Sequence, residues 1–354
     1  MLALALPLSF FLVMLETAIG SFIVLFLLDV YGGLKIARLV KTANAKPAQP
    51  LKAAVSPASE EDVPLSAEEE VGSSLAEGQA TASDDAAEVS LKTPSARAAA
   101  KRVGVTNGFL VFQGLLYLIL ALLVYWFGSA FATPSIFDGI KGFYQQYPLD
   151  RAWLAYQFTP LWVFLGLLLV YNVLLWFKQR APRWIVGALA CLAGLAELLV
   201  IGMAYRPLAA DSLGGAFTVA GIVVGALALG GVLTAMLLGH WYLNTPTASG
   251  KPLEFATLVM LIGLGLELVF SFFIHSTIPA ALPQLGTPPI SAGGLNVIRF
   301  IFGFLFTLGL GALAFRLTRG RSFQSATGML YLAVAFAFTG EIMTRGLFFL
   351  PHLR

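Results

Sequence analysis

The sequence has few charged residues, a single cysteine and only three histidines. Charged residues make up 12% of the 354 residues, whereas soluble domains carry about twice that share. Cys191 alone cannot form an internal disulfide, and an iron–sulfur cluster needs about four cysteine ligands. The chain also lacks a phosphate-binding loop and a Rossmann fingerprint beside a strand. No soluble catalytic domain, nucleotide site or nucleic-acid partner is therefore expected.

Long hydrophobic runs take the place of these features. Hydrophobic residues make up 58% of the chain, and the mean hydropathy is +0.82. The runs reach about 20 residues, enough for a helix to cross a bilayer. They are continuous and rich in Leu, Ala and Gly rather than alternating, which excludes membrane strands. The sequence therefore predicts an all-α, polytopic bundle of about eight transmembrane helices. The expected spans are 4–31, 105–131, 157–177, 184–205, 216–243, 254–276, 295–317 and 325–350.

The pattern divides the chain into three parts. Residues 1–34 form a first transmembrane helix, which lacks the basic start of a signal peptide and is expected to be retained. Residues 35–104 form an acidic linker rich in Ala, Ser and Glu, and residues 105–354 form a seven-helix bundle. Sixteen Lys and Arg flank the spans on the linker side, against four on the other side. Because basic residues favour the cytoplasm, we expect both termini outside a bacterial inner membrane.

Three connections carry their own predictions. Residues 40–102 bury too little apolar surface to fold alone, so they are a flexible cytoplasmic linker or a strap that docks a soluble partner. The aromatic, amphipathic connection 132–156 is expected to lie on the membrane surface or to contact an external partner. The four prolines of residues 277–294 predict a stiff outer loop that could cap a pocket.

Ionisable residues within the spans are the main candidates for function. A charge at the centre of the bilayer costs at least about 2.5 kcal/mol. The spans nevertheless contain four acids, Glu16, Glu197, Glu267 and Glu341. At about 1.5 Å per helical residue, all four lie near the midplane or in the outer half. Spans four, six and eight carry theirs at similar depth, which indicates an ancient duplication or a shared useful depth.

Two arginines and a histidine lie at matching depth. Arg299 begins span seven, Arg345 lies one turn from Glu341, and His275 ends span six. Glu341 and Arg345 stand at i and i+4, so they share a helix face and can pair. Each acid could simply fix helix packing through a private salt bridge. Together, however, the residues favour a buried polar pocket, in which a carboxylate takes a proton from a quinol and an arginine binds a quinone oxygen.

Other polar and small residues have simpler interpretations. Gly221 and Gly225 have the spacing of close helix packing. His240 stands with Trp241 and Tyr242, which is typical of an interfacial aromatic belt. It lies at the other membrane face from His275 and His352 and cannot pair with either. His352 follows Pro351 near the C-terminus, so axial ligation of haem by His275 and His352 is not expected either. No cluster of metal ligands appears in the sequence.

Three segments resemble a known family. The last span, "AFAFTGEIMTRGLFFLPHL", is similar to the last helix of the membrane-anchor subunits of dimethyl sulfoxide reductases. The start of span seven, "GGLNVIRFIFG", resembles an arginine-bearing helix start in that family, and "LETAIGSFIVLFLLD" resembles its first helix. The wider group includes polysulfide-reductase type subunits. The resemblance covers spans one and five to eight, and it includes an eight-span arrangement with both termini outside. The chain departs from the family by its long linker and by having no histidine in spans two and three.

The resemblance implies a quinone-interacting subunit without its own redox centre. Such a subunit binds menaquinol or ubiquinol in the outer half of the bilayer and passes electrons to an iron–sulfur or other redox subunit. Glu341, Arg345 and Arg299 match the family motifs. We expect the acids Glu341, Glu267 and Glu16 to exchange protons, with Arg345, Arg299, His275 and Glu197 binding the quinone. Whether the chain itself is catalytic stays open. The alternatives are a purely structural anchor and a proton-coupled secondary transporter, since membrane carboxylates also form proton relays.

Overall fold

The computed structural model describes residues 2–45, 105–209, 213–245, 247–274 and 292–349. Within these ranges eight helical segments are long and apolar enough to cross a membrane, as predicted, and no strand occurs. The chain is therefore a multi-pass helical membrane protein. Most of the linker and of the proline-rich loop 277–294 lies outside the described residues.

The helices differ little from the predicted spans. In chain order the elements are α1 (Leu2–Ala45), α3 (Asn107–Phe131), α4 (Pro134–Asp138), α5 (Phe143–Gln146), α6 (Arg151–Leu154), α7 (Thr159–Trp176), α8 (Arg180–Tyr205), η1 (Arg206–Leu208), α9 (Ala216–Asn244), α10 (Lys251–Ile274), α11 (Ala292–Ile298), the π-helical η3 (Arg299–Phe306), α12 (Thr307–Arg319) and α13 (Phe323–Phe349). The largest difference is α1, which continues into the first residues of the predicted linker.

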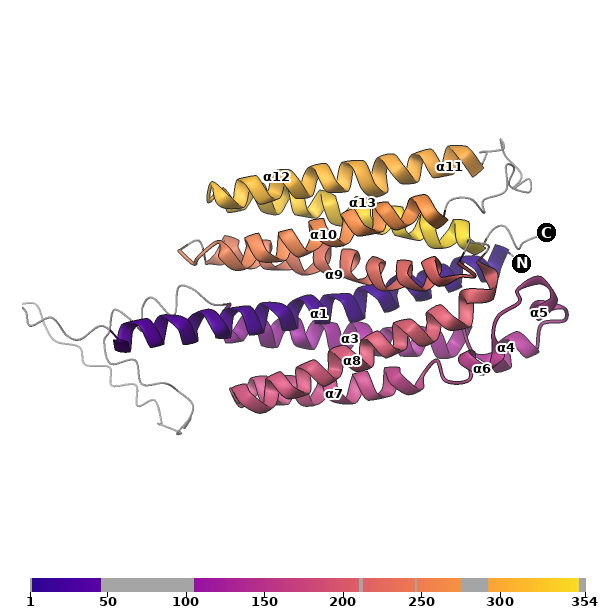
Figure 1. The fold of residues 1–354 in the computed structure, drawn as a ribbon, viewed down its shortest axis with the longest axis horizontal. Coiled ribbons are helices and arrows are strands. Elements are labelled where there is room, and N and C mark those ends of the chain that lie inside the picture. The colour runs from indigo at the N-terminus through magenta and orange to yellow at the C-terminus, as the bar shows by residue number, and fades with distance from the viewer. Residues whose placement is uncertain (1, 46–104, 210–212, 246, 275–291, 350–354) are drawn as a thin grey trace, which may run out of the picture.

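The long helices form two four-membered groups (Figure 1). The first group contains α1, α3, α7 and α8. The second contains α9, α10, the continuous run from α11 to α12, and α13. Each group packs its helices in the same cyclic order, and its first helix lies against the other group. α1 begins and α13 ends at the same end of the bundle, here called the terminal end. The sequence predicts this end to be the outer side.

The two groups meet where α1 crosses α9. Buried residues make up 78% of the apolar window of α1 and 72% of that of α9, against 33–44% in the other spans. A Cβ on Gly20 would collide with the carbonyl of Ala226, and a Cβ on Gly230 would collide with the backbone at Gly20 and Ser21. The absence of side chains at both glycines thus lets the two backbones touch. This crossing brings α1 into the second group and so positions Glu16.

The outer surface of the bundle is apolar, as a lipid-facing surface must be. Large aliphatic side chains on α3, α7 and α8 are exposed. Aromatic rings are exposed near both ends, with Trp126, Tyr156 and Trp162 towards the terminal end and Trp176 and Phe177 towards the opposite end. Two aromatic belts separated by aliphatic residues are typical of a membrane-spanning protein.

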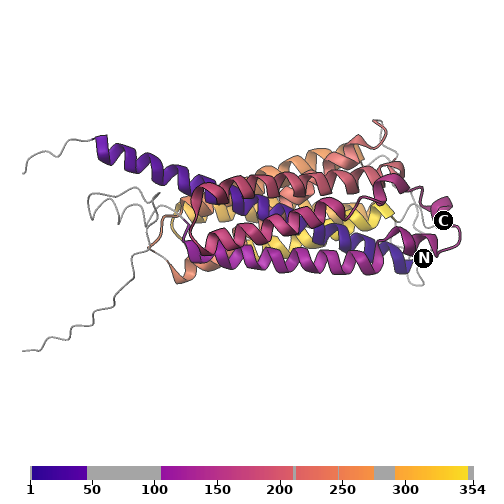
Figure 2. The same cartoon turned by 90° about the horizontal axis from the view of Figure 1, so that it is seen from below.

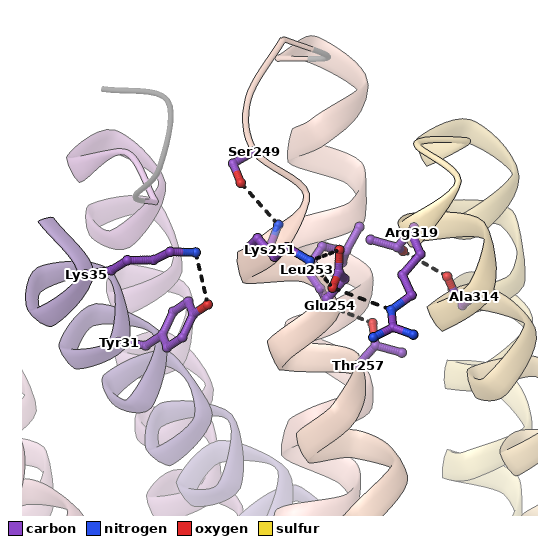
Figure 3. A network of polar contacts seen from close by, with 10 residues as sticks. Tyr31, Lys35, Ser249, Lys251, Leu253, Glu254, Thr257, Ala314 and Arg319 are labelled. Atoms are coloured by element: carbon purple, nitrogen blue, oxygen red, sulfur yellow. Dashed lines mark hydrogen bonds and ion pairs between the residues drawn. The ribbon is translucent and has the colours of Figure 1, made fainter. Parts of the chain in front are cut away.

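Short elements cover the two ends. At the terminal end, α4 to α6 form a cap in which Phe137 stacks on Phe143 and the carboxylate of Asp150 accepts the N–H of Ala152 at 2.9 Å. At the opposite end, Glu254 at the start of α10 contacts Lys251 at 2.9 Å and Arg319 at 3.8 Å (Figure 3). α1 projects beyond the other helices there (Figures 1 and 2). The ion pairs of Glu254 with Lys251 and Arg319 are partly exposed, so they contribute little stability.

Candidate functional site

Five buried ionisable residues lie together within the second group, where α1 packs against it, in the half of the bundle nearer the terminal end. All are at least nine-tenths buried, and Glu16 is fully buried. They come from four different segments: Glu16 from α1, Glu267 from α10, Arg299 from η3, and Glu341 and Arg345 from α13. We call them the charged cluster. Five of the seven predicted site residues are thus brought together.

Arg345 holds two of the acids of the charged cluster. Its Nη2 lies 2.6 Å from Glu16 Oε1 and 2.6 Å from Glu341 Oε1. The same nitrogen approaches the carbonyl oxygen of Gly221 at 3.4 Å. The pairing of Glu341 with Arg345 predicted from their i,i+4 spacing is therefore confirmed. The sequence did not predict that the arginine also reaches across to α1.

The three carboxyls of the charged cluster lie close to one another. Glu341 lies in the middle, at short range from the carboxyls of both Glu16 and Glu267. Glu267 forms no ion pair with a cation of the described residues. Two carboxylates have no hydrogen to share, so a proton on one of them would let neighbouring carboxyls form a hydrogen bond.

Arg299 lies at the first residue of the π-helical stretch η3. π-helical turns inside α-helices occur frequently at functional sites. The Arg299 Nη2 donates to the hydroxyl of Ser271 at 2.8 Å, and the guanidinium lies 5.2 Å from the ring centre of Phe300 and 5.7 Å from that of Phe304. Its Nε is buried without a hydrogen-bond partner in the protein. Arg299 therefore has a donor to offer to a ligand.

Glycines make room for the charged cluster. A Cβ on Gly225 would lie 2.8 Å from Arg345 Nη2 and 3.3 Å from Glu341 Oε1. Gly303 of η3 and Gly340 of α13 lie against each other in the same way. The sequence interpretation of Gly221 and Gly225 as close-packing residues was therefore incomplete, because what they accommodate includes the arginine side chain.

Two cavities adjoin the charged cluster. The larger has a volume of about 40 Å³, and Glu267, Arg299 and Arg345 line it together with Phe270 and Phe304. A water molecule needs roughly 10–15 Å³ of such space, so this cavity has room for about three waters. The smaller, about 10 Å³, is lined by Glu267 and Glu341. Glu267 is thus the acid that borders both cavities, and Glu16 borders neither.

The remaining two predicted site residues are not part of the charged cluster. Glu197 lies on α8 and faces the first turn of α7, near the backbone N–H of Leu161, although neither of its oxygens has a hydrogen-bond partner in the protein. A carboxylate is stabilised there by the unpaired N–H groups of the helix start. Glu197 lines neither cavity. His275 lies outside the described residues, so its role stays a prediction.

A second buried ion pair, which we did not predict, lies near the opposite end of the first group. Asp29 Oδ1 is 2.6 Å from Arg183 Nη2, and Tyr171 donates its hydroxyl to Asp29 Oδ2 at 3.0 Å. The sequence analysis counted Arg183 only as a cytoplasmic flanking charge. The signal that could have revealed the pair was an acid inside the end of one span facing an arginine at the start of another.

A third set of buried polar residues links the two groups of helices near the middle of the bundle. The Tyr117 hydroxyl donates to Gln113 Oε1 and lies 2.8 Å from Thr234 Oγ1. Thr234 in turn donates to the carbonyl oxygen of Ser21 at 3.3 Å. All four residues are fully buried. They tie α1, α3 and α9 together, and none lines either cavity.

The described residues offer no set of three His, Cys, Asp or Glu side chains arranged to hold a metal ion. Within the charged cluster, the guanidinium of Arg345 pairs with both Glu16 and Glu341. His240 lies at the opposite end, where its Nδ1 is 3.0 Å from the hydroxyl of Tyr331. His352 lies outside the described residues, as does His275.

The chain matches no protein-family model, no curated protein and no solved structure.

Proposed function

We propose that the chain is a quinone-binding membrane subunit of an electron-transfer complex. The observation that carries this proposal is the larger cavity, where a carboxyl (Glu267), a guanidinium with an unused donor (Arg299) and two phenyl rings (Phe270 and Phe304) meet. A quinone presents the matching groups: a flat ring, oxygens that accept hydrogen bonds, and hydroxyls in its reduced form. Small-molecule sites are typically apolar with a few converging polar groups.

The proposed roles follow from the donors and acceptors. Arg299 donates to one ring oxygen of the quinone, and Glu267 exchanges a proton with the hydroxyl of the quinol. Oxidation of a quinol releases two protons and two electrons. The electrons pass to a redox subunit of iron–sulfur or similar type, and the protons leave through the carboxyls and the water of the cavity. Glu341 holds Glu267 in place, and Arg345 balances the charges of Glu16 and Glu341.

The size of the cavity sets one requirement. About 40 Å³ accommodates water but not a quinone ring. Phe270 and Phe348 line the cavity and are not fully buried, so they are the side chains that must turn aside. Side-chain rotamer changes on ligand binding are common. Binding is thus expected to open the site rather than fill a preformed slot.

Binding of a short-tailed naphthoquinol to the full chain in nanodiscs tests the proposal. A hydrogen bond to a charged group contributes about 1.5–3 kcal/mol, so Arg299→Met should weaken binding by about ten- to a hundredfold. Arg319→Met is the matched control, because Arg319 lies at the opposite end. Equal affinity in both variants would contradict the site. In the assembled complex, Glu341→Gln should slow quinol oxidation while assembly is retained.

A proton-coupled secondary transporter is the second candidate, and the arrangement of the helices favours it over a passive anchor. The bundle consists of two similar groups of helices, and internal structural repeats are common among transporters. Uptake of a solute into proteoliposomes, driven by a proton gradient and lost in Glu267→Gln, would support this function. If the chain is a purely structural anchor, Glu267→Gln should change neither the binding of the naphthoquinol nor the uptake of a solute.

A further inference from the structure

The charged cluster has an imbalance that packing alone does not require. It contains three carboxyls, Glu16, Glu267 and Glu341, but only two guanidiniums, Arg299 and Arg345. With every group ionised, the cluster would carry one net negative charge in a nearly water-free interior. An uncompensated buried charge is among the most costly arrangements in a protein. One added proton makes the cluster neutral.

The contacts indicate which carboxyl holds that proton. Arg345 lies 2.6 Å from both Glu16 and Glu341, so these two acids are stabilised as carboxylates. Glu267 has no such partner among the described cations, and its carboxyl lies beside that of Glu341, with which it lines the smaller cavity. A protonated Glu267 can donate its O–H to the Glu341 carboxylate, which satisfies both groups.

A path for exchange lies beside Glu267. This residue borders both cavities, and the larger one has room for about three waters. The buried Nε of Arg299, which lines the same cavity, has no partner in the protein and can orient one of these waters. Glu16, in contrast, is fully buried behind Arg345.

We propose that the charged cluster is a binding site for a single exchangeable proton, held at rest on Glu267 and exchanged with water in the larger cavity. The proton belongs to the cluster as a whole, because the three carboxyls interact directly. Loss of the proton leaves the cluster with one negative charge, and its return restores neutrality. This site does not depend on which ligand the cavity takes, so it holds for a quinone subunit and for a transporter alike.

Infrared spectroscopy counts such protons directly. A protonated carboxyl has a C=O stretch that carboxylates lack, and the band shifts when H₂O is replaced by D₂O. The measurement uses the full chain in nanodiscs at neutral pH, without quinone. The background is Glu197→Gln, which removes the other buried span glutamate from the spectrum. This background should show a band equivalent to one carboxyl, and Glu267→Gln should abolish it.

Two variants that change the charge of the cluster distinguish a proton-binding site from a cluster that only fixes helix packing. Glu341→Gln leaves two carboxyls and two guanidiniums, which are neutral without a proton, so the band should again disappear. Arg299→Met leaves three carboxyls and one guanidinium, so the band should about double. Arg299→Met also preserves the pairing of Arg345 with Glu16 and Glu341, so this variant is expected to fold. Circular dichroism and gel filtration test whether it does. Arg319→Met is the control and should leave the band unchanged.

A background without the band overturns the proposal. So does a band that survives in Glu267→Gln, or one that fails to grow in folded Arg299→Met. The infrared measurement contains no quinone, so its result does not depend on whether the chain binds the naphthoquinol. The proposed function and the proton site can therefore fail separately.

Discussion

Tyr205 and Phe349 meet edge to face, with ring centres 5.5 Å apart, at the terminal end of the two groups of helices. Tyr205 ends α8, the last helix of the first group, and Phe349 ends α13, the last helix of the second. The two residues are separated along the chain by the same offset as Glu197 and Glu341. The last helices of both groups thus share a pattern of an acid, a glycine and an aromatic residue, which supports an internal duplication.

This aromatic pair is expected to couple the two groups. A double-mutant cycle with Tyr205→Leu and Phe349→Leu should give a coupling of about 0.5–1.5 kcal/mol, the usual value for an edge-to-face pair. Thermal unfolding in detergent measures it. The exposed Trp126 and Trp162 provide a control cycle, because these rings lie on the lipid-facing surface. A coupling near zero for Tyr205 and Phe349 would mean that their contact contributes no specific stability.

Gly225 should tolerate no side chain. Gly225→Ala brings a methyl group to within 2.8 Å of Arg345 Nη2, and overpacking of this kind costs about 1–3 kcal/mol. Gly265→Ala is the matched control, since a Cβ there meets no atom within 4 Å. That control should be neutral or stabilising by up to about 1 kcal/mol. Unfolding midpoints distinguish the two, and equal midpoints would contradict the observed packing around Arg345.

Asp29 and Arg183 should depend on each other. Removal of one member of a buried ion pair costs about 3–5 kcal/mol, because the other charge is left uncompensated. Asp29→Asn and Arg183→Met should each therefore lower stability by that amount. The double variant Asp29→Leu/Arg183→Met should be more stable than either single variant, because no charge remains buried. Additive losses in denaturant unfolding would show that the pair is not coupled.

Glu197 should affect stability but not ligand binding. Glu197→Gln removes a buried carboxyl beside the first turn of α7, where an acid near a helix start contributes up to about 2 kcal/mol. Since Glu197 lines neither cavity, naphthoquinol affinity should stay within about twofold of wild type, a difference below 0.5 kcal/mol. A large loss of affinity would return Glu197 to the site, where the sequence analysis placed it.

The sequence predicted the membrane class, the eight spans and the positions of the acids along them, because these depend on composition and position along the chain. Depth alone, however, does not say which way a side chain points around its helix or which helices are neighbours. Glu197 lies at a similar position along its span to Glu267. Glu197 on α8 nevertheless faces α7, whereas Glu267 on α10 faces Glu341 on α13. The family resemblance and the side of the membrane on which the termini lie stay predictions.

Other residues escaped prediction because their roles arise from long-range packing. Gly225 looks like an ordinary close-packing glycine until Arg345, far along the chain, is placed against it. Arg183 resembles any flanking basic residue until α1 brings Asp29 to it. Ser271 has no distinguishing neighbours in the sequence, although it is the hydrogen-bond partner of Arg299.

The π-helical stretch η3 has a consequence for how this site can change. A π-turn behaves as a one-residue insertion in an α-helix, and one residue corresponds to a rotation of about 100° around the helix axis. Deletion of a single residue between Arg299 and Phe306 would therefore swing Arg299 away from Glu267, while α12 kept its contacts with α13. The length of this segment, independently of the residue types within it, is a means of switching the arginine in or out of the cavity.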